Sequence, residues 1–172
     1  MKAIVIFIAS LVFMYADFLF AEISPVTISG LEVYFVPRLL LMYILLISIY
    51  ISPSMSAFTG IVFGIMLDVY IGSVYGVHTF GIAAFVAFMH TAFRVFYRDV
   101  VAMAFVILLL TFVYESYIFL IYRVLDLVSL PVFDYLALRA APSLLLNALL
   151  FIIIFVTALK TSKVRNNLQS KH

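Results

Sequence analysis

Six apolar runs, separated by short breaks, account for most of this 172-residue chain. They cover about residues 3–20, 36–51, 56–71, 77–93, 100–122 and 141–159. Most of them approach the roughly 20 residues that an α-helix needs to cross a bilayer. Backbone groups in lipid must be paired within the chain, and the period-two alternation of a β-barrel is missing. The sequence therefore predicts an all-α integral membrane protein, a single domain (1–172) of six transmembrane helices.

The composition excludes several other classes of protein. Hydrophobic residues make up 67% of the chain and charged residues only 10%, whereas about a quarter of a soluble domain is charged. The net charge of +2 gives no reason to expect a nucleic-acid partner. Cysteine is absent, which excludes disulfides and Cys-ligated metals.

The Lys and Arg residues predict the orientation. With six helices both termini lie on one side, and seven of the ten basic residues fall there: Lys2, Arg94, Arg98, Lys160, Lys163, Arg165 and Lys171. The positive-inside rule then predicts a multi-pass plasma-membrane protein with both termini in the cytoplasm. We expect the tail, 160–172, to rest on the anionic inner leaflet. Because Asp17 interrupts the first run, we interpret that run as a retained helix rather than a cleaved signal peptide.

The outer half of the predicted bundle collects three acids and three bases: Asp17, Asp68, Glu115, Arg38, Arg123 and Arg139. A carboxylate in lipid is costly, so each acid is expected to pair with an arginine. Two interpretations remain open for these groups, an ionic network that fixes helix packing or a contact with a partner or ligand. Glu115 lies deepest and is flanked by Tyr114 and Tyr117. It is the residue that we expect to serve recognition of a partner helix.

Four glycines and an aspartate recur at a spacing of four residues: Gly60, Gly64, Asp68, Gly72 and Gly76. Residues four apart share a helix face, so Gly60 and Gly64 predict a groove that another helix can approach closely. Asp68 continues that face by one turn, where a donor on the neighbouring helix could meet it. Gly72 and Gly76 lie past the helix end and are expected to supply the positive φ angles of a tight turn.

The segment 57–81, AFTGIVFGIMLDVYIGSVYGVHTFG, resembles the signature of the bacterial rod shape-determining protein family MreD, most closely in its Gram-positive members. That signature has two glycines four apart, an Asp, a small-residue turn and a glycine in the next helix. Further matches are Pro37-Arg38 at the second helix, Glu115 beside its tyrosines, and Arg139, Pro142 and Asn147 in RAAPSLLLN.

The resemblance implies a non-enzymatic component of the cell-elongation complex, which carries out lateral peptidoglycan synthesis and helps determine cell shape. The implied partners are a bitopic MreC-like protein and, directly or indirectly, the filament protein MreB, a RodA-like glycosyltransferase and a class B transpeptidase. The implied fold is similar to the substrate-binding subunits of energy-coupling-factor vitamin transporters. Those subunits are the alternative function. The bulky first helix, IVIFIASLVFMYADFLF, and the absence of Trp argue against it.

An intramembrane enzyme is a third class, and the sequence gives it no support. No GxSG serine motif occurs, and the Asp residues are scattered one per segment. His78, His90 and His172 fall on different parts of the predicted topology, so they form no shared metal site. We expect no catalytic residue, cofactor or metal, and we expect His78 to form hydrogen bonds beside the outer charges.

Overall fold

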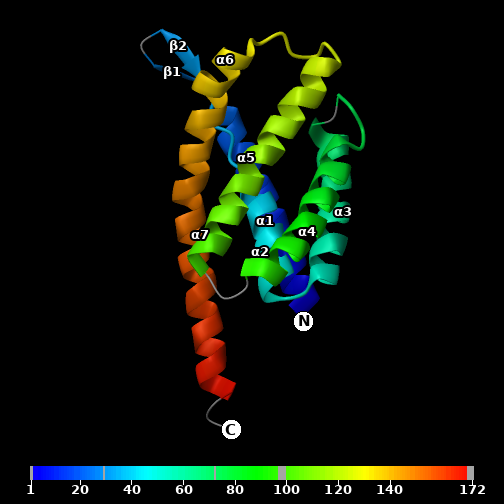
Figure 1. The fold of residues 1–172 in the computed structure, drawn as a ribbon, viewed down its shortest axis with the longest axis vertical. Helices are drawn as coiled ribbons and strands as arrows, with labels where there is room; N and C mark the ends of the chain where they lie inside the picture. The colour runs from blue at the N-terminus through cyan, green and yellow to red at the C-terminus, as the bar shows by residue number, and fades with distance from the viewer. Residues whose placement is uncertain (1, 29, 72, 97–99, 170–172) are drawn as a thin grey trace.

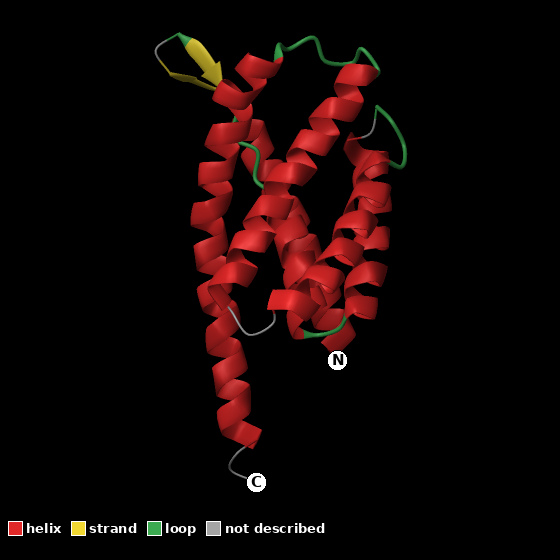
Figure 2. Ribbon diagram, viewed as in Figure 1, coloured by secondary structure: helices red, strands yellow, loops and turns green. Residues whose placement is uncertain are grey.

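The computed structural model describes the chain except for residues 1, 29, 72, 97–99 and 170–172, and describes no side chains for residues 2, 92–96, 100 and 156–169. Its helices pack side by side in one bundle, and two short strands stand at one end (Figures 1 and 2). The elements, in chain order, are α1 (Lys2–Ile23), β1 (Val26–Ile28), β2 (Leu31–Val33), α2 (Leu39–Tyr50), α3 (Pro53–Ile71), α4 (Val77–Phe96), α5 (Val100–Val124), α6 (Val132–Tyr135), the π-helical turn η1 (Leu136–Ala140) and α7 (Ala141–Gln169).

The start of α1 and the end of α7 lie at the same end of the bundle (Figure 1). We call the opposite end, where β1 and β2 lie, the hairpin end. Within the described residues, four helical stretches are long and apolar enough to cross a membrane: Ala3–Ile23, Pro53–Ile71, Val101–Val124 and Val132–Phe155. Shorter apolar helices cover Leu39–Tyr50 and Val77–Thr91. The chain is thus a helical membrane protein, and the count of six passes stays a prediction.

The second and the last of the expected helices have boundaries that differ from those predicted. Residues 36–38, expected in the second helix, precede its first residue, Leu39; a proline favours extended backbone in the residue before it, and Pro37 follows Val36. The last helix was expected to start at residue 141, but α6, η1 and α7 are contiguous in the chain from Val132. Arg139 was expected in the break before the last helix. It lies in the π-helical turn η1, and its charge is neutralised by Glu115. The helix also continues into the predicted tail, as far as Gln169.

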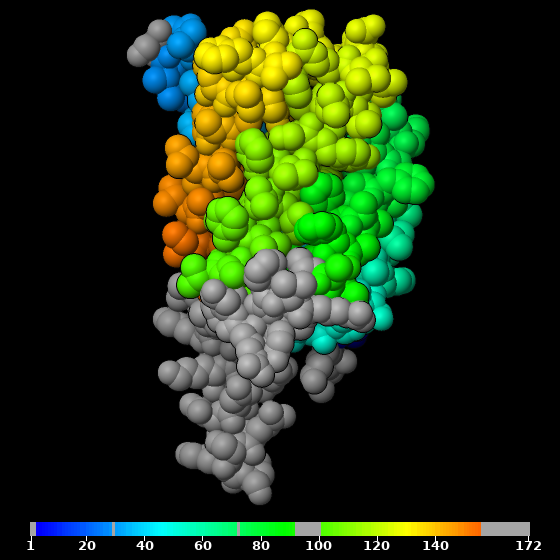
Figure 3. Space-filling model, viewed as in Figure 1, coloured from blue at the N-terminus to red at the C-terminus, as the bar shows by residue number. Residues whose placement is uncertain are grey.

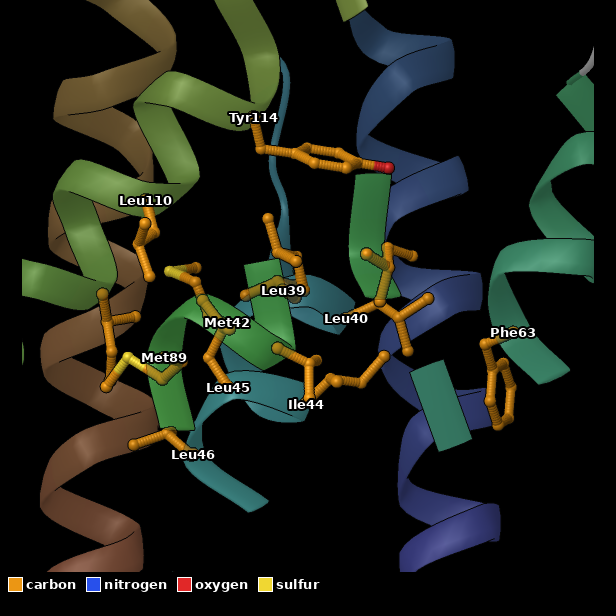
Figure 4. Packing of buried hydrophobic residues seen from close by; sticks show 14 of the residues in the cluster. Leu39, Leu40, Met42, Ile44, Leu45, Leu46, Phe63, Met89, Leu110 and Tyr114 are labelled. Carbon is orange, nitrogen blue, oxygen red and sulfur yellow. The ribbon is translucent and has the colours of Figure 1, made fainter. Parts of the chain in front are cut away.

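The core is built around α2. Nine of its twelve residues are buried, and Met42, Ile44 and Leu45 are completely inaccessible. A helix that is apolar all round belongs in an interior, and Figure 4 shows the α2 side chains pointing outward on several sides toward neighbouring helices. The surrounding contacts come from α3, α4 and α5, with Phe63, Met89 and Leu110 among them.

The glycines of α3 let α4 pack closely against it. A Cβ added at Gly64 would lie 2.7 Å from the Cα of Thr79, and one at Gly60 would lie 2.8 Å from a methyl of Ile82. The glycine face is therefore covered by this chain's own α4 and is not open to another protein. Gly76 has a φ of +93° in the turn into α4, and Gly72 lies outside the described residues.

Gly64→Ala is expected to destabilise the protein more than Gly60→Ala does. The new methyl at position 64 meets backbone, which cannot move aside, whereas at position 60 it meets the end of a flexible side chain. Overpacking of this kind costs about 1–3 kcal/mol. Thermal unfolding in detergent, followed by the loss of monodisperse protein, measures the difference. Equal midpoints for the two variants would show that the α3–α4 contact is looser than described.

Candidate functional site

An extended segment enters the bundle at the hairpin end, and we call residues 34–38 the strap. Every backbone N–H from Tyr34 to Leu40 has a hydrogen-bond partner (Pro37 has none to donate). Tyr34 donates to the Leu138 carbonyl at 2.8 Å and Phe35 to the Ser24 hydroxyl at 2.9 Å. Further along, Val36 N donates to Ser143 and Arg38 N to Asn147. The first two N–H groups of α2 donate to Asp17. Irregular backbone is tolerated at membrane depth only where it is buried and paired, so these partners are what permits the strap.

Ser143 and Asn147 hold the strap against α7. The Asn147 amide accepts from Arg38 N at 2.8 Å and donates to the Val36 carbonyl at 3.1 Å, as a neighbouring strand would. Ser143 Oγ accepts from Val36 N at 3.0 Å and donates to the Tyr34 carbonyl at 3.3 Å. The spacings match, because four extended residues span about 13 Å and the nine helical steps from position 138 to 147 rise about 13.5 Å.

Pro142 leaves one of these acceptors, the Leu138 carbonyl, without a helical partner. Proline has no N–H to give to the carbonyl four residues earlier, which here is that of Leu138. That carbonyl accepts instead from Tyr34 N. In the adjoining π-helical turn, Ala141 N reaches back to the Leu136 carbonyl. The Leu138 carbonyl is thus free to accept a hydrogen bond at the position that Tyr34 N of the strap reaches.

Asp17 and Asp68 each cap the start of a neighbouring helix. Asp17 accepts from Leu39 N at 2.8 Å and Leu40 N at 3.1 Å, at the first turn of α2. Asp68 accepts from His78 N at 2.8 Å, Thr79 N at 3.0 Å and Thr79 Oγ1 at 2.5 Å, at the first turn of α4. The expectation that both would pair with arginine was wrong, because the free N–H groups and positive dipole of a helix N-terminus neutralise a carboxylate equally well.

Glu115 alone among the three acids is ion-paired, and it holds two arginines. Arg38 Nε and Nη2 donate to Glu115 Oε2 at 2.8 and 2.6 Å. Arg139 Nε and Nη2 lie 3.0 and 2.9 Å from Oε1. The Arg38 guanidinium also lies 5.5 Å from the centre of the Tyr114 ring. Arg123 is not part of this triad, since it is exposed and donates to the Leu130 carbonyl.

The expected contact between Glu115 and a partner helix does not fit this geometry. Glu115 is only 4% exposed, and its carboxylate is occupied by the two arginines. Tyr114 is buried with its hydroxyl 2.9 Å from His78 Nδ1, and the Tyr117 hydroxyl lies 3.4 Å from the Val77 carbonyl. Glu115 and Tyr114 are therefore not available at the surface of the bundle, and Tyr117 is partly buried.

A cavity of about 390 Å³ lies beside the triad. Most of its wall is apolar, and its polar side chains include Asp17, Arg38, His78, Tyr114, Tyr122 and Arg139. Exposed residues at the hairpin end, Ala21, Ser73 and Leu127, also line it, so it opens there. His78 Nε2 and the Tyr122 hydroxyl are buried without a hydrogen-bond partner among the described residues. Such unpaired groups are costly, and both belong to residues that line the cavity.

The comparisons with known proteins now decide the family. The family model of the rod shape-determining protein MreD matches residues 1–161. The chain belongs to the MreD family. Searches of curated proteins and of solved structures found no match. Membership supports a role in rod shape determination, in a family of structural membrane proteins.

Sequence reasoning about this MreD-family chain missed Ser143, Thr79 and Tyr122. Ser143 had a usable signal, because it stands four residues before Asn147 on one face of a helix and directly follows a proline. Thr79 and Tyr122 had none, since a lone hydroxyl in an apolar run does not reveal its neighbour. Among the described residues no group of His, Asp and Glu could hold a metal ion.

Glu115→Gln is expected to lower the yield and the thermal stability of the folded protein. The substitution leaves two guanidinium groups without their counter-ion, and the Arg38 side chain is only 13% exposed. Breaking a buried pair on one side costs of the order of 3 kcal/mol. Arg139→Gln should cost less, because the Arg139 side chain is 31% exposed.

The matched control is Glu22→Gln, the same change at an exposed position of α1. Its unfolding midpoint in detergent should equal that of the unmodified protein. If Glu115→Gln behaved like this control, the triad would contribute nothing to the fold.

Proposed function

We propose that this protein is a non-enzymatic scaffold of the cell-elongation complex and that it binds a bitopic MreC-like protein at the hairpin end of its bundle. Membership of the MreD family supports the role. The observation that carries the site is the cavity that opens there, whose lining includes His78 and Tyr122, two residues with an unpartnered buried polar atom. MreB, a RodA-like glycosyltransferase and a class B transpeptidase would join directly or through this partner.

The chemistry of the cavity indicates what the partner would present. Its walls are largely aliphatic and aromatic, with Leu67, Ile118 and Phe119 among them. The Tyr122 hydroxyl can donate or accept a hydrogen bond, and so can His78 Nε2, according to tautomer. An apolar side chain of the partner would fill the space, and backbone polar groups beside it would face the polar residues of the lining, with Tyr122 and His78 turning toward them. This is the pattern of an anchor residue in a pocket.

The proposed topology has six passes, a multi-pass arrangement in the plasma membrane and both termini in the cytoplasm. An even number of passes agrees with α1 starting and α7 ending at the same end of the bundle (Figure 1). The hairpin end then faces outward, toward the wall. Of the ten basic residues, the three expected there are Arg38, Arg123 and Arg139, in keeping with the positive-inside rule.

The family assignment gives no support to the alternative function, a substrate-binding subunit of a vitamin transporter. A cavity also suits a small-molecule binding subunit, but the matched family is one of shape determination. The similarity of fold to the energy-coupling-factor subunits stays a prediction.

Alkaline phosphatase, which is active only outside the cytoplasm, tests the topology. Fused after His172 it should be inactive, because the basic residues keep that end inside. Inserted between Leu125 and Ser129, in the hairpin-end turn after α5, it should be active. An active fusion after His172 would contradict the orientation or the six-pass count.

Tyr122→Phe is expected to weaken capture of a tagged MreC-like partner while leaving the yield of folded protein unchanged. It removes a hydroxyl that has no partner within the described fold, so only an interaction with an occupant is lost. One hydrogen bond is worth about 0.5–1.5 kcal/mol, which corresponds to roughly a two- to twelvefold loss of affinity. Co-purification from detergent over a range of partner concentrations measures it.

The control for this change is Tyr15→Phe, on the exposed face of α1. A second, stronger variant is Val128→Trp, which fills the cavity from its lining turn, with Val124→Trp, 74% exposed and not part of the lining, as its control. Undiminished capture by both Tyr122→Phe and Val128→Trp would exclude the cavity as the partner's site.

A further inference from the structure

The hairpin between α1 and the strap has one wholly apolar face. β1 and β2 pair antiparallel with Val26 opposite Val33, Thr27 opposite Glu32 and Ile28 opposite Leu31. Residues directly opposite in an antiparallel pair share a face of the sheet, and the face alternates along each strand. Val26, Ile28, Leu31 and Val33 therefore lie on one face, and the other face carries Thr27 and Glu32.

This apolar face is largely uncovered by the rest of the chain. Val26, Ile28 and Leu31 are 38%, 49% and 57% exposed. The hairpin stands off from the bundle beside α6 (Figures 1 and 3). A two-stranded hairpin is marginally stable in water by itself. An aliphatic face of this size would be unfavourable there, because no other part of the described chain covers it.

Both ends of the hairpin are tied to membrane-spanning helices. The apolar span of α1 ends at Ile23, three residues before Val26, so β1 starts within about 10 Å of it. After β2, Tyr34 N donates to the Leu138 carbonyl, which lies inside the apolar span Val132–Phe155. The headgroup layer adds only about 5–8 Å to each side of a 30 Å hydrocarbon core. The hairpin is thus held at the level of the membrane interface.

We propose that the apolar face of the hairpin inserts into the interface of the leaflet at the hairpin end, where headgroups meet acyl chains. The ligand is the lipid surface itself, bound through aliphatic side chains. The polar face is turned to water, where the Tyr34 hydroxyl donates to the Glu32 carboxylate at 3.1 Å. Residues 24–37 contain no Lys or Arg, so the insertion is hydrophobic and does not depend on anionic lipid.

Insertion has a consequence for the strap. β2 ends at Val33 and the strap begins at the next residue. A hairpin fixed in the leaflet holds the outer end of the strap, while Ser143 and Asn147 hold its length. The membrane therefore helps to set the position of Val36, Pro37 and Arg38, which line the cavity.

The chain has no tryptophan, so one introduced residue reports on its surroundings without background. Ile28→Trp and Thr27→Trp place the reporter on the apolar and the polar face of the same strand. Each full-length variant is reconstituted in phosphatidylcholine nanodiscs with or without lipids brominated at acyl carbons near the headgroup. Leu31→Trp serves as a second apolar-face reporter should Ile28→Trp fold poorly.

The apolar-face reporters should emit at shorter wavelength than Thr27→Trp and be quenched by brominated lipid. Acrylamide in the water should quench Thr27→Trp by at least roughly twofold more, as expected for opposite faces of an interfacial element. Replacing part of the phosphatidylcholine by phosphatidylglycerol should change neither result. Equal quenching of both faces by acrylamide would overturn the proposal. So would shielding of Ile28→Trp that arises only after an MreC-like partner is added, or only with anionic lipid.

Discussion

The pairing of backbone groups inside the membrane is the constraint on which this structure depends. The central helix, α2, has twelve residues and is about 18 Å long, too short for a hydrocarbon core of about 30 Å. The strap of five extended residues, up to about 16 Å long, completes the distance. Its backbone cannot pair with itself as a helix does. The side chains of Ser24, Ser143 and Asn147, together with the Leu138 carbonyl, therefore take over that task.

The three acids Asp17, Asp68 and Glu115 face the same electrostatic problem, a carboxylate placed within a helical bundle. Each carboxylate lies where positive charge or unpaired N–H groups converge: the first turn of α2 for Asp17, the first turn of α4 for Asp68 and two guanidinium groups for Glu115. Each contact also joins two different elements: α1 with α2, α3 with α4, and the strap with α5. Desolvation of a carboxylate is costly, so these contacts specify which helices are neighbours as well as stabilising them.

The sequence predicted the local features better than the contacts between helices. Apolar runs located α3, α4 and α5 to within a few residues, and Gly60 and Gly64 indicated a close helix contact, because length and spacing are local properties. The partners of Asp17 and Asp68 were not predictable in this way. A backbone N–H is present at nearly every position and leaves no trace in composition, whereas an arginine is visible. The same applies to Pro142. The sequence shows that Pro142 lacks a backbone donor, but it does not show that Tyr34 N bonds to the carbonyl left free.

The strap connects the features of the hairpin end mechanically. Arg38 gives its backbone N–H to Asn147 and its side chain to Glu115, while Val36, Pro37 and Arg38 form part of the cavity wall. Three elements thus converge on the five residues of the strap: α5 through Glu115, η1 through Leu138 and α7 through Ser143 and Asn147. Ser24, just after α1, holds Phe35 N. The strap side of the wall can move only by breaking hydrogen bonds that have no replacement in lipid. This part of the cavity wall is therefore fixed by the fold itself, because Val36, Pro37 and Arg38 are held from several sides.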